Sequence, residues 1–151
     1  MDIRAYIKQL DQQLKEYDSI YHAAAVRYGL SDTALWILYL VADAPEPCTQ
    51  QDLCQQCSFP KQTINTAINN LIREGYLILE PLPGARNRKG IRLTEPGQQL
   101  VQRTVYRIQQ AEETAYGRFS DQELENYLDL TRRLNAYLRE AVQNQLTGGN
   151  L

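Results

Sequence analysis

The sequence predicts a mainly α-helical protein with one short β-hairpin, and two observations carry this prediction. Apolar residues recur at steps of three or four along most of the 151 residues, which is the period of an amphipathic helix. From Thr49 to Thr94 the pattern changes to helix, turn and helix, followed by two β-prone runs that flank a basic loop. This order predicts a winged helix-turn-helix over residues 31–94, within a single domain of residues 1–151.

The first part of the chain predicts two helices. Residues 2–27 should form a long amphipathic helix, whose apolar positions are Ile3, Ile7, Leu10, Leu14, Tyr17, Tyr21 and Ala24. Ser31 is a suitable N-cap for a second, more apolar helix that should end before Pro45.

The helix-turn-helix should begin at Thr49. Thr49 is a good N-cap, and Asp52, three positions later, can complete a capping box. This short helix should end in a tight turn at residues 57–59. Pro60 fits the first position of the next helix, where a missing N–H costs nothing, with Ser58 or Phe59 as the cap.

The second helix of this motif should have two chemically different faces. Its apolar face is predicted to be Ile64, Ala67, Ile68 and Leu71. Its other face has amides, hydroxyls and one ammonium, with no carboxylate before Glu74: Lys61, Gln62, Thr63, Asn65, Thr66, Asn69 and Asn70. Asn and Gln can pair with adenine, Lys with guanine, and the Thr methyl can contact thymine, whereas a carboxylate would be repelled by phosphate. This face predicts contacts in a DNA major groove, above all from Gln62, Asn65 and Thr66.

A hairpin with a basic tip should follow the second helix. Gly75 can adopt the left-handed conformation that ends a helix, and residues 76–79 form a β-prone run that should break at Pro81. The returning strand is expected at residues 91–93. The loop between the strands contains Arg86, Arg88 and Lys89. Such charges usually only solvate a hairpin tip, but their position directly after a polar helix favours contacts with DNA phosphates.

Two more helices should complete the fold. Thr94 and Pro96 start one that should extend through Ala111, and Ser120 with Glu123 forms a capping box for the last helix. The terminal helices, at residues 1–28 and 95–146, are too long and too apolar for a small winged domain to bury. Burial against a second copy predicts a two-fold homodimer. A free coiled coil is the alternative, although the drifting register favours a globular interface.

Charge is distributed unevenly along the chain. The formal net charge of −2 and the pI near 5.4 argue, taken alone, against a nucleic-acid-binding protein. Residues 60–92, however, hold six basic and two acidic side chains, a local net charge of +4, so the remainder carries −6. A basic patch on an acidic body is the electrostatic pattern expected of a compact DNA-binding protein.

Four segments of the chain follow one family pattern. They are residues 60–71, Glu74-Gly-Tyr76, the basic residues at 86–89 and Arg92-Leu-Thr-Glu-Pro-Gly97. Together with the flanking helices they resemble the MarR family of bacterial transcriptional regulators over nearly the whole chain. The resemblance implies a triangular homodimer in which the terminal helices form the interface and each winged helix contacts a DNA half-site. The chain departs from the family at the wing, where the usual Asp and Arg positions fall at Ala85 and at Asn87 or Arg86.

These features predict a sequence-specific, DNA-binding transcriptional regulator. We expect a repressor that binds a palindromic operator in double-stranded DNA as a homodimer. A winged helix used for protein contact is the alternative, and the salt dependence of DNA affinity would separate the two.

The cysteines and the single histidine do not predict catalysis or a cofactor. Cys54 and Cys57 have the spacing of a thiol–disulfide motif, and a thiol-based redox sensor or enzyme remains an alternative. The motif ends a helix rather than beginning one beside a strand, which favours a packing role for Cys48, Cys54 and Cys57. His22 is far from them in sequence, so no metal site is expected, and we assign His22 to the surface or an interface.

Aromatic residues of the first two helices suggest a ligand. Those at positions where the family resemblance places an effector cleft are Tyr17, Tyr21, Tyr28, Trp36 and Tyr39. Aromatic residues at helical spacing usually belong to the core, and this interpretation is favoured here. The alternative is a small aromatic effector that releases the protein from DNA.

The sequence also predicts the cellular compartment of the protein. No apolar stretch approaches the length of a membrane span, and residues 1–6 lack the apolar core of a signal peptide. We therefore expect a cytoplasmic protein that has no membrane contact.

Overall fold

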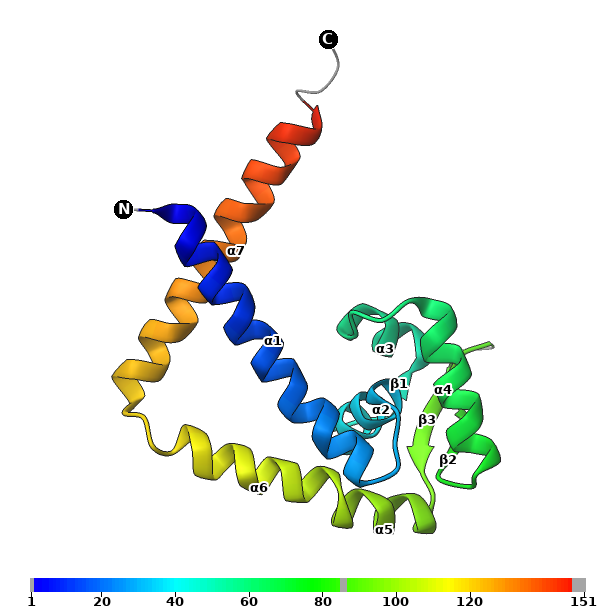
Figure 1. Ribbon diagram of the computed structural model, residues 1–151. Coiled ribbons are helices and arrows are strands. Elements are labelled where there is room, and N and C mark those ends of the chain that lie inside the picture. The colour runs from blue at the N-terminus through cyan, green and yellow to red at the C-terminus, as the bar shows by residue number, and fades with distance from the viewer. Residues whose placement is uncertain (1, 85–86, 148–151) are drawn as a thin grey trace. The chain divides into compact units, whose positions relative to one another are not determined.

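A computed structural model describes residues 2–84 and 87–147 of the chain. Its contacts divide the chain into two compact units, Met1–Gln109 and Gln110–Leu151. The elements in chain order are α1 (Ile3–Arg27), α2 (Asp32–Asp43), β1 (Cys48–Thr49), α3 (Gln50–Gln56), α4 (Lys61–Arg73), β2 (Leu77–Pro81), β3 (Lys89–Leu93), α5 (Glu95–Arg103), α6 (Val105–Tyr116) and α7 (Asp121–Thr147) (Figure 1). The mainly helical fold with one small hairpin is confirmed.

The first unit contains a three-stranded antiparallel sheet in the order β1-β3-β2. β3 is the central strand, with Ile91 opposite both Cys48 of β1 and Leu79 of β2. β1 was not predicted, because two residues are too few to show the alternation of a strand. Only pairing with a strand that lies some forty residues later in the sequence defines it.

The core of this unit is formed mainly by α2 and α4, together with residues of α3, the sheet, α5 and α6. α4 packs against α2, α3 and β2. The largest fully buried side chains come from nearly every element of the unit: Leu35, Ile37, Leu38, Leu53, Ile64, Leu71, Leu77, Ile91, Val101, Val105 and Thr104. The apolar face predicted for α4 is therefore the buried one, and its polar face is left toward solvent.

Most of the predicted helix boundaries are confirmed by their caps. The Ser31 hydroxyl accepts a hydrogen bond from the Ala34 N–H at 3.1 Å, and Thr49 with Asp52 forms the full capping box. Gly75 has φ +83°, the left-handed value that ends α4. Pro60 differs from its prediction: it is the N-cap of α4 and not the first helical residue. Its ψ of 142° is extended, while its carbonyl already accepts the first helical bond from the Ile64 N–H.

The hairpin is longer than predicted at both strands. β2 runs through Pro81, which the sequence pattern placed as a breaker, and β3 starts at Lys89, which it placed in the loop. The topology explains the first error, because β2 is an edge strand and a proline at its end removes no donor that the sheet needs. Lys89 belongs to β3 because it pairs with Pro81 of β2.

The helix predicted from Thr94 to Ala111 is broken at Thr104. Thr104 has φ −123° and ψ −78°, and α5 ends before it while α6 begins after it. The buried Thr104 hydroxyl donates to the Leu100 carbonyl at 2.7 Å, a back-bond that competes with the regular helical pattern. Thr66 and Thr114 make the same back-bond within unbroken helices, so this bond does not by itself account for the break, which hydrophobic period alone does not reveal.

A close junction joins the end of α4 to the start of α5. The Thr94 N–H donates to the Tyr76 carbonyl at 3.0 Å, the Thr94 hydroxyl donates to the Gly75 carbonyl, and the Gly97 N–H donates to the Thr94 hydroxyl at 3.1 Å. A Cβ on Gly97 would lie 2.0 Å from the Tyr76 carbonyl oxygen. The Leu-Thr-Glu-Pro-Gly segment therefore fixes the start of the hairpin against α5, and only glycine fits at its end.

The described part of the second unit, residues 110–147, contains the C-terminal part of α6 and the whole of α7. The predicted capping box is present at its turn: the Glu123 carboxylate accepts from the Ser120 N–H at 2.8 Å, and the Ser120 hydroxyl accepts from the Glu123 N–H at 3.3 Å. None of residues 121–147 is buried.

Candidate functional site

The polar face of α4 is exposed as a continuous surface. Its side chains that are open to solvent are Lys61, Gln62, Thr63, Thr66, Asn69 and Asn70. Two of these groups are partly engaged within the helix, because the Thr66 hydroxyl donates to the Gln62 carbonyl and the Asn70 side-chain oxygen accepts from Arg73. The Thr66 methyl group and the Gln62 amide remain available to a ligand on this face.

Asn65 has a different environment from its predicted partners. It is half-buried, and its side-chain oxygen accepts a hydrogen bond from the Gln50 amide of α3. This contact uses only the side-chain oxygen of Asn65, so the NH₂ group can donate a hydrogen bond to another acceptor. Gln50 is a functional candidate that the sequence pattern did not reveal, since nothing in the spacing of two residues fifteen apart indicates that their helices cross there.

The wing has one described basic residue at its tip and one at the start of its returning strand. Arg88 and Lys89 are exposed, while Arg86 lies outside the described residues. The Leu82 N–H donates to the Arg88 carbonyl at 3.0 Å and closes the loop end. Within the stem, Arg92 forms an ion pair with Glu80 at 2.9 Å. Arg92 is therefore partly neutralised, and Arg88 and Lys89 carry the positive charge that this part of the hairpin presents.

Asp52 links the capping box of α3 to the wing. Its carboxylate accepts hydrogen bonds from the Thr49 N–H at 2.7 Å and from the Thr49 hydroxyl at 2.8 Å. These bonds, the backbone one first, hold the pKa of Asp52 below its usual value, and the positive charge of Arg88 lowers that pKa further. Arg88 thus lies near the N-terminus of α3, so the wing charge and the helix-turn-helix belong to one surface.

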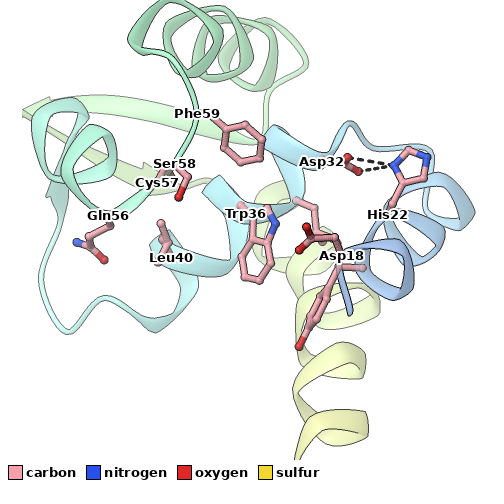
Figure 2. Close-up of a pocket in the computed structure, with 11 residues that line it drawn as sticks. Asp18, His22, Asp32, Trp36, Leu40, Gln56, Cys57, Ser58 and Phe59 are labelled. Atoms are coloured by element: carbon pink, nitrogen blue, oxygen red, sulfur yellow. Dashed lines mark hydrogen bonds and ion pairs between the residues drawn. The ribbon is translucent and has the colours of Figure 1, made fainter. Parts of the chain in front are cut away.

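A cavity of about 560 Å³ lies within the first unit. It is lined by residues of α1, α2, α3 and the turn before α4, namely Asp18, Tyr21, His22, Asp32, Leu35, Trp36, Leu40, Gln56, Cys57, Ser58 and Phe59 (Figure 2). The turn before α4 leads directly into the polar helix. A molecule in this cavity would therefore contact the segment that positions α4.

The aromatic residues proposed for a ligand site divide into three groups. Tyr21 and Trp36 line the cavity. Tyr17 and Tyr39 do not line the cavity but contact residues that do: the ring centroids of Tyr17 and Tyr21 are 5.0 Å apart, and those of Tyr39 and Trp36 are 5.5 Å apart. Tyr28 packs against the hydrophobic core and does not line the cavity. The sequence missed the acidic lining and Phe59, because these come from three separate segments.

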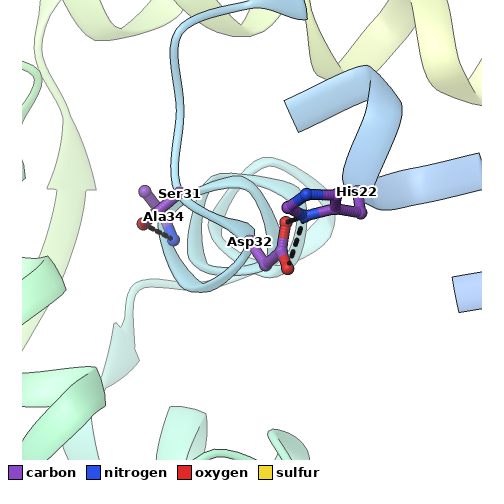
Figure 3. A network of polar contacts seen from close by, with 4 residues as sticks. All are labelled: His22, Ser31, Asp32 and Ala34. Carbon is purple, nitrogen blue, oxygen red and sulfur yellow. Dashed lines mark hydrogen bonds and ion pairs between the residues drawn. The ribbon is translucent and has the colours of Figure 1, made fainter. Parts of the chain in front are cut away.

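His22 and Asp32 form a pair at one end of this cavity. The His22 Nδ1 lies 2.9 and 3.0 Å from the two Asp32 oxygens, and it must be the donor because a carboxylate only accepts (Figure 3). The pair joins α1 to the first turn of α2, next to the Ser31 cap. The surface position predicted for His22 is confirmed, since its side chain is 63% exposed.

Cys48 and Cys57 do not have the surroundings of a reactive cysteine. Cys48, Cys54 and Cys57 are free and half-buried. Burial raises the pKa of Cys48, and burial together with the neighbouring Cys54 raises the pKa of Cys57. A raised pKa lowers the fraction of nucleophilic thiolate at neutral pH. Among the described residues no group of three or more potential metal ligands is found.

In the part of the chain that the structure describes, no helix is long and apolar enough to cross a membrane.

Residues 28–86 match the sequence profile of the MarR family. No curated protein sequence matches the chain significantly. Among solved structures, the MarR family regulator NMB1585 from Neisseria meningitidis has 17% identity and a TM-score of 0.79, with 93% of this chain and 98% of that chain covered.

Two further similar structures are described together with a ligand. CouR from Rhodococcus jostii RHA1, bound to p-coumaroyl-CoA, has 19% identity and a TM-score of 0.70, with 88% of this chain and 92% of that chain covered. Bordetella bronchiseptica BpsR, whose DNA binding is described as regulated by 6-hydroxynicotinic acid, has 19% identity and a TM-score of 0.65, with 85% and 91% covered. At these identities the likeness shows a shared fold.

Proposed function

We propose that the protein is a homodimeric transcriptional repressor that binds a palindromic operator, because residues 28–86 match the sequence profile of the MarR family. The observation that carries this proposal is the exposed face of α4, which lacks carboxylates and adjoins a wing bearing Arg88 and Lys89. In this proposal residues 31–94 contact the DNA. Gln62, Asn65 and Thr66 reach base edges, Lys61, Thr63 and Asn69 flank them, and Arg86, Arg88 and Lys89 contact phosphates.

The experiment that tests DNA binding has two steps. Bound duplexes are first selected from a random pool, and the affinity for the selected sequence is then measured at several salt concentrations. Phosphate contacts release counterions, so the logarithm of affinity should fall linearly with the logarithm of salt concentration. No enriched sequence, or an affinity that does not depend on salt, would overturn the proposal and favour a winged helix that contacts protein.

The terminal helices support the homodimer. Leu10 of α1 is 52% exposed, and Leu134 and Leu138 of α7 are 52% and 57% exposed. Such leucines recur along both helices, and so much apolar surface on one chain is typical of an interaction site. We propose that residues 1–28 and 95–146 bury these side chains against a second copy. Sedimentation at micromolar concentration should find a dimer, and a compact monomer there would contradict this assignment.

The cavity supports control of DNA binding by a small molecule. Similar regulators are described with p-coumaroyl-CoA and 6-hydroxynicotinic acid. Here the cavity is lined by Cys57, Ser58 and Phe59 of the turn that enters α4. A ligand that displaces this turn would shift α4 in the major groove, because the helix begins directly after it. A ligand that binds the free protein more tightly than the DNA complex must weaken DNA binding by the same factor.

A further inference from the structure

The cavity beside α4 has two chemically different ends. In Figure 2, Asp18 and His22 lie on one side of the Trp36 indole, while Gln56 and Cys57 lie on the other. The first end holds the carboxylates of Asp18 and Asp32. The second holds the Gln56 amide, the Cys57 thiol and the Ser58 hydroxyl. A ligand that fills the cavity would thus place one end among carboxylates and the other among neutral polar groups.

The carboxylate end carries uncompensated negative charge. Asp32 is engaged by His22. Within residues 2–84 and 87–147, no side chain forms a hydrogen bond or ion pair with Asp18, and no lysine or arginine lines the cavity. An anionic ligand would therefore meet the unpaired Asp18 carboxylate beside that of Asp32, with no lysine or arginine in the lining to offset the repulsion, which is an unfavourable arrangement. A cationic ligand would supply the positive charge that the carboxylates at this end of the cavity lack.

The middle of the cavity is aromatic. Trp36 has its ring centroid 5.2 Å from that of Tyr21, and Phe59 faces the same space (Figure 2). Aromatic faces attract cations as well as apolar bodies, and indole is the strongest of them. The walls and the acidic end therefore favour the same kind of molecule.

We propose that this cavity binds a small organic cation with an aromatic body, such as an arylalkyl ammonium, with its charge at Asp18 and Asp32. The inference rests on the effector control proposed above and names the chemical class of the effector. The charge is held by the carboxylates, and the ring lies against Trp36 and Phe59.

The test uses the intrinsic fluorescence of Trp36, which is the single tryptophan of the chain and lines the cavity. The full-length protein, without DNA, is titrated with 2-phenylethylammonium, 2-phenylethanol and phenylacetate, which share a phenyl group and differ in charge. The cation should bind at least about tenfold more tightly than the anion, because two carboxylates attract the one and repel the other. The same titrations are made with Asp18→Asn and with Asp11→Asn. Asp11 is an exposed residue of α1 outside the cavity, so its variant changes the total charge equally.

The Asp18→Asn variant should lose most of the preference for the cation, and Asp11→Asn should keep it. Equal affinity for cation and anion, an equal effect of the two variants, or no fluorescence change with any of the three compounds at millimolar concentration would each overturn the inference. These readouts contain no DNA, so they do not depend on operator binding. If the cation binds as expected but leaves operator affinity unchanged, the inferred ligand class stands and effector control of DNA binding fails.

Discussion

Replacement of Gly97 by alanine tests the junction that fixes the hairpin against α5. The new Cβ would lie 2.0 Å from the Tyr76 carbonyl oxygen, whereas a carbon and a carbonyl oxygen normally approach only to about 3.3 Å. No side-chain rotation can relieve this overlap, because both groups belong to the backbone. The two segments must separate by more than about 1 Å to restore that normal contact distance.

The expected loss of stability follows from two costs and one gain. Overpacking of this kind costs about 1–3 kcal/mol. Movement of the Tyr76 carbonyl also weakens the bond that it accepts from the Thr94 N–H at 3.0 Å, a net loss of about 1 kcal/mol. The better helix propensity of alanine returns at most about 1 kcal/mol. The variant should therefore be less stable by about 1–3 kcal/mol.

Urea unfolding at one fixed protein concentration measures this difference, because the stability of a dimer depends on concentration. The midpoint should fall while the slope of the free energy against urea stays unchanged. Gln99→Ala is the matched control, since Gln99 is exposed on the same helix, and it should stay within about 0.5 kcal/mol of the wild type. A Gly97→Ala protein as stable as this control would refute the reasoning about the junction.

Three further predictions concern the DNA-binding surface and its supports. Arg88→Ala should weaken binding to all sequences about equally and flatten the salt slope by roughly one unit, so an unchanged slope in filter-binding titrations would leave the wing without a phosphate contact. Gln62→Ala should cost about 1–3 kcal/mol on the selected operator and almost nothing on scrambled duplex, and an equal loss on both at one salt concentration would remove Gln62 from base readout. Because the pKa of Asp52 is lowered from its ordinary 3.8, its contribution to stability is present above that value and is lost as pH falls through the lower folded value. Asp52→Asn should therefore be less stable than the wild type at neutral pH, with a difference that shrinks well below pH 3.8 in urea unfolding; a constant difference would contradict the cause assigned to the shift.

Local chemistry explains why much of the helical structure was predictable. The capping boxes at Thr49 and Ser120 depend on residues three positions apart, and both form as predicted. Gly75 adopts its left-handed conformation because glycine alone has no Cβ to oppose it. The four apolar positions of α4 are all buried, because helical period assigns each side chain to a face before any tertiary contact exists.

The candidate site was predictable where it lies on one element and not where elements meet. The polar face of α4 follows from its own sequence. The contact of Asn65 with Gln50, the approach of Arg88 to Asp52 and the ion pair of Arg92 with Glu80 each join residues that local patterns cannot bring together.

The sequence by itself determined the helical faces, most of the caps and the basic character of the wing, because these depend on interactions within a few residues. Tertiary structure alone decided that residues 48–49 form a strand, that the helix breaks at Thr104, and that Asp18, Asp32 and Phe59 share a cavity with Trp36. The strand and the cavity depend on contacts between distant segments, and the break at Thr104 leaves no trace in the apolar pattern, because Val101, Val105 and Ile108 keep helical spacing across it. Hydrophobic period carries no information about such contacts, since it specifies which face is buried and not what that face meets.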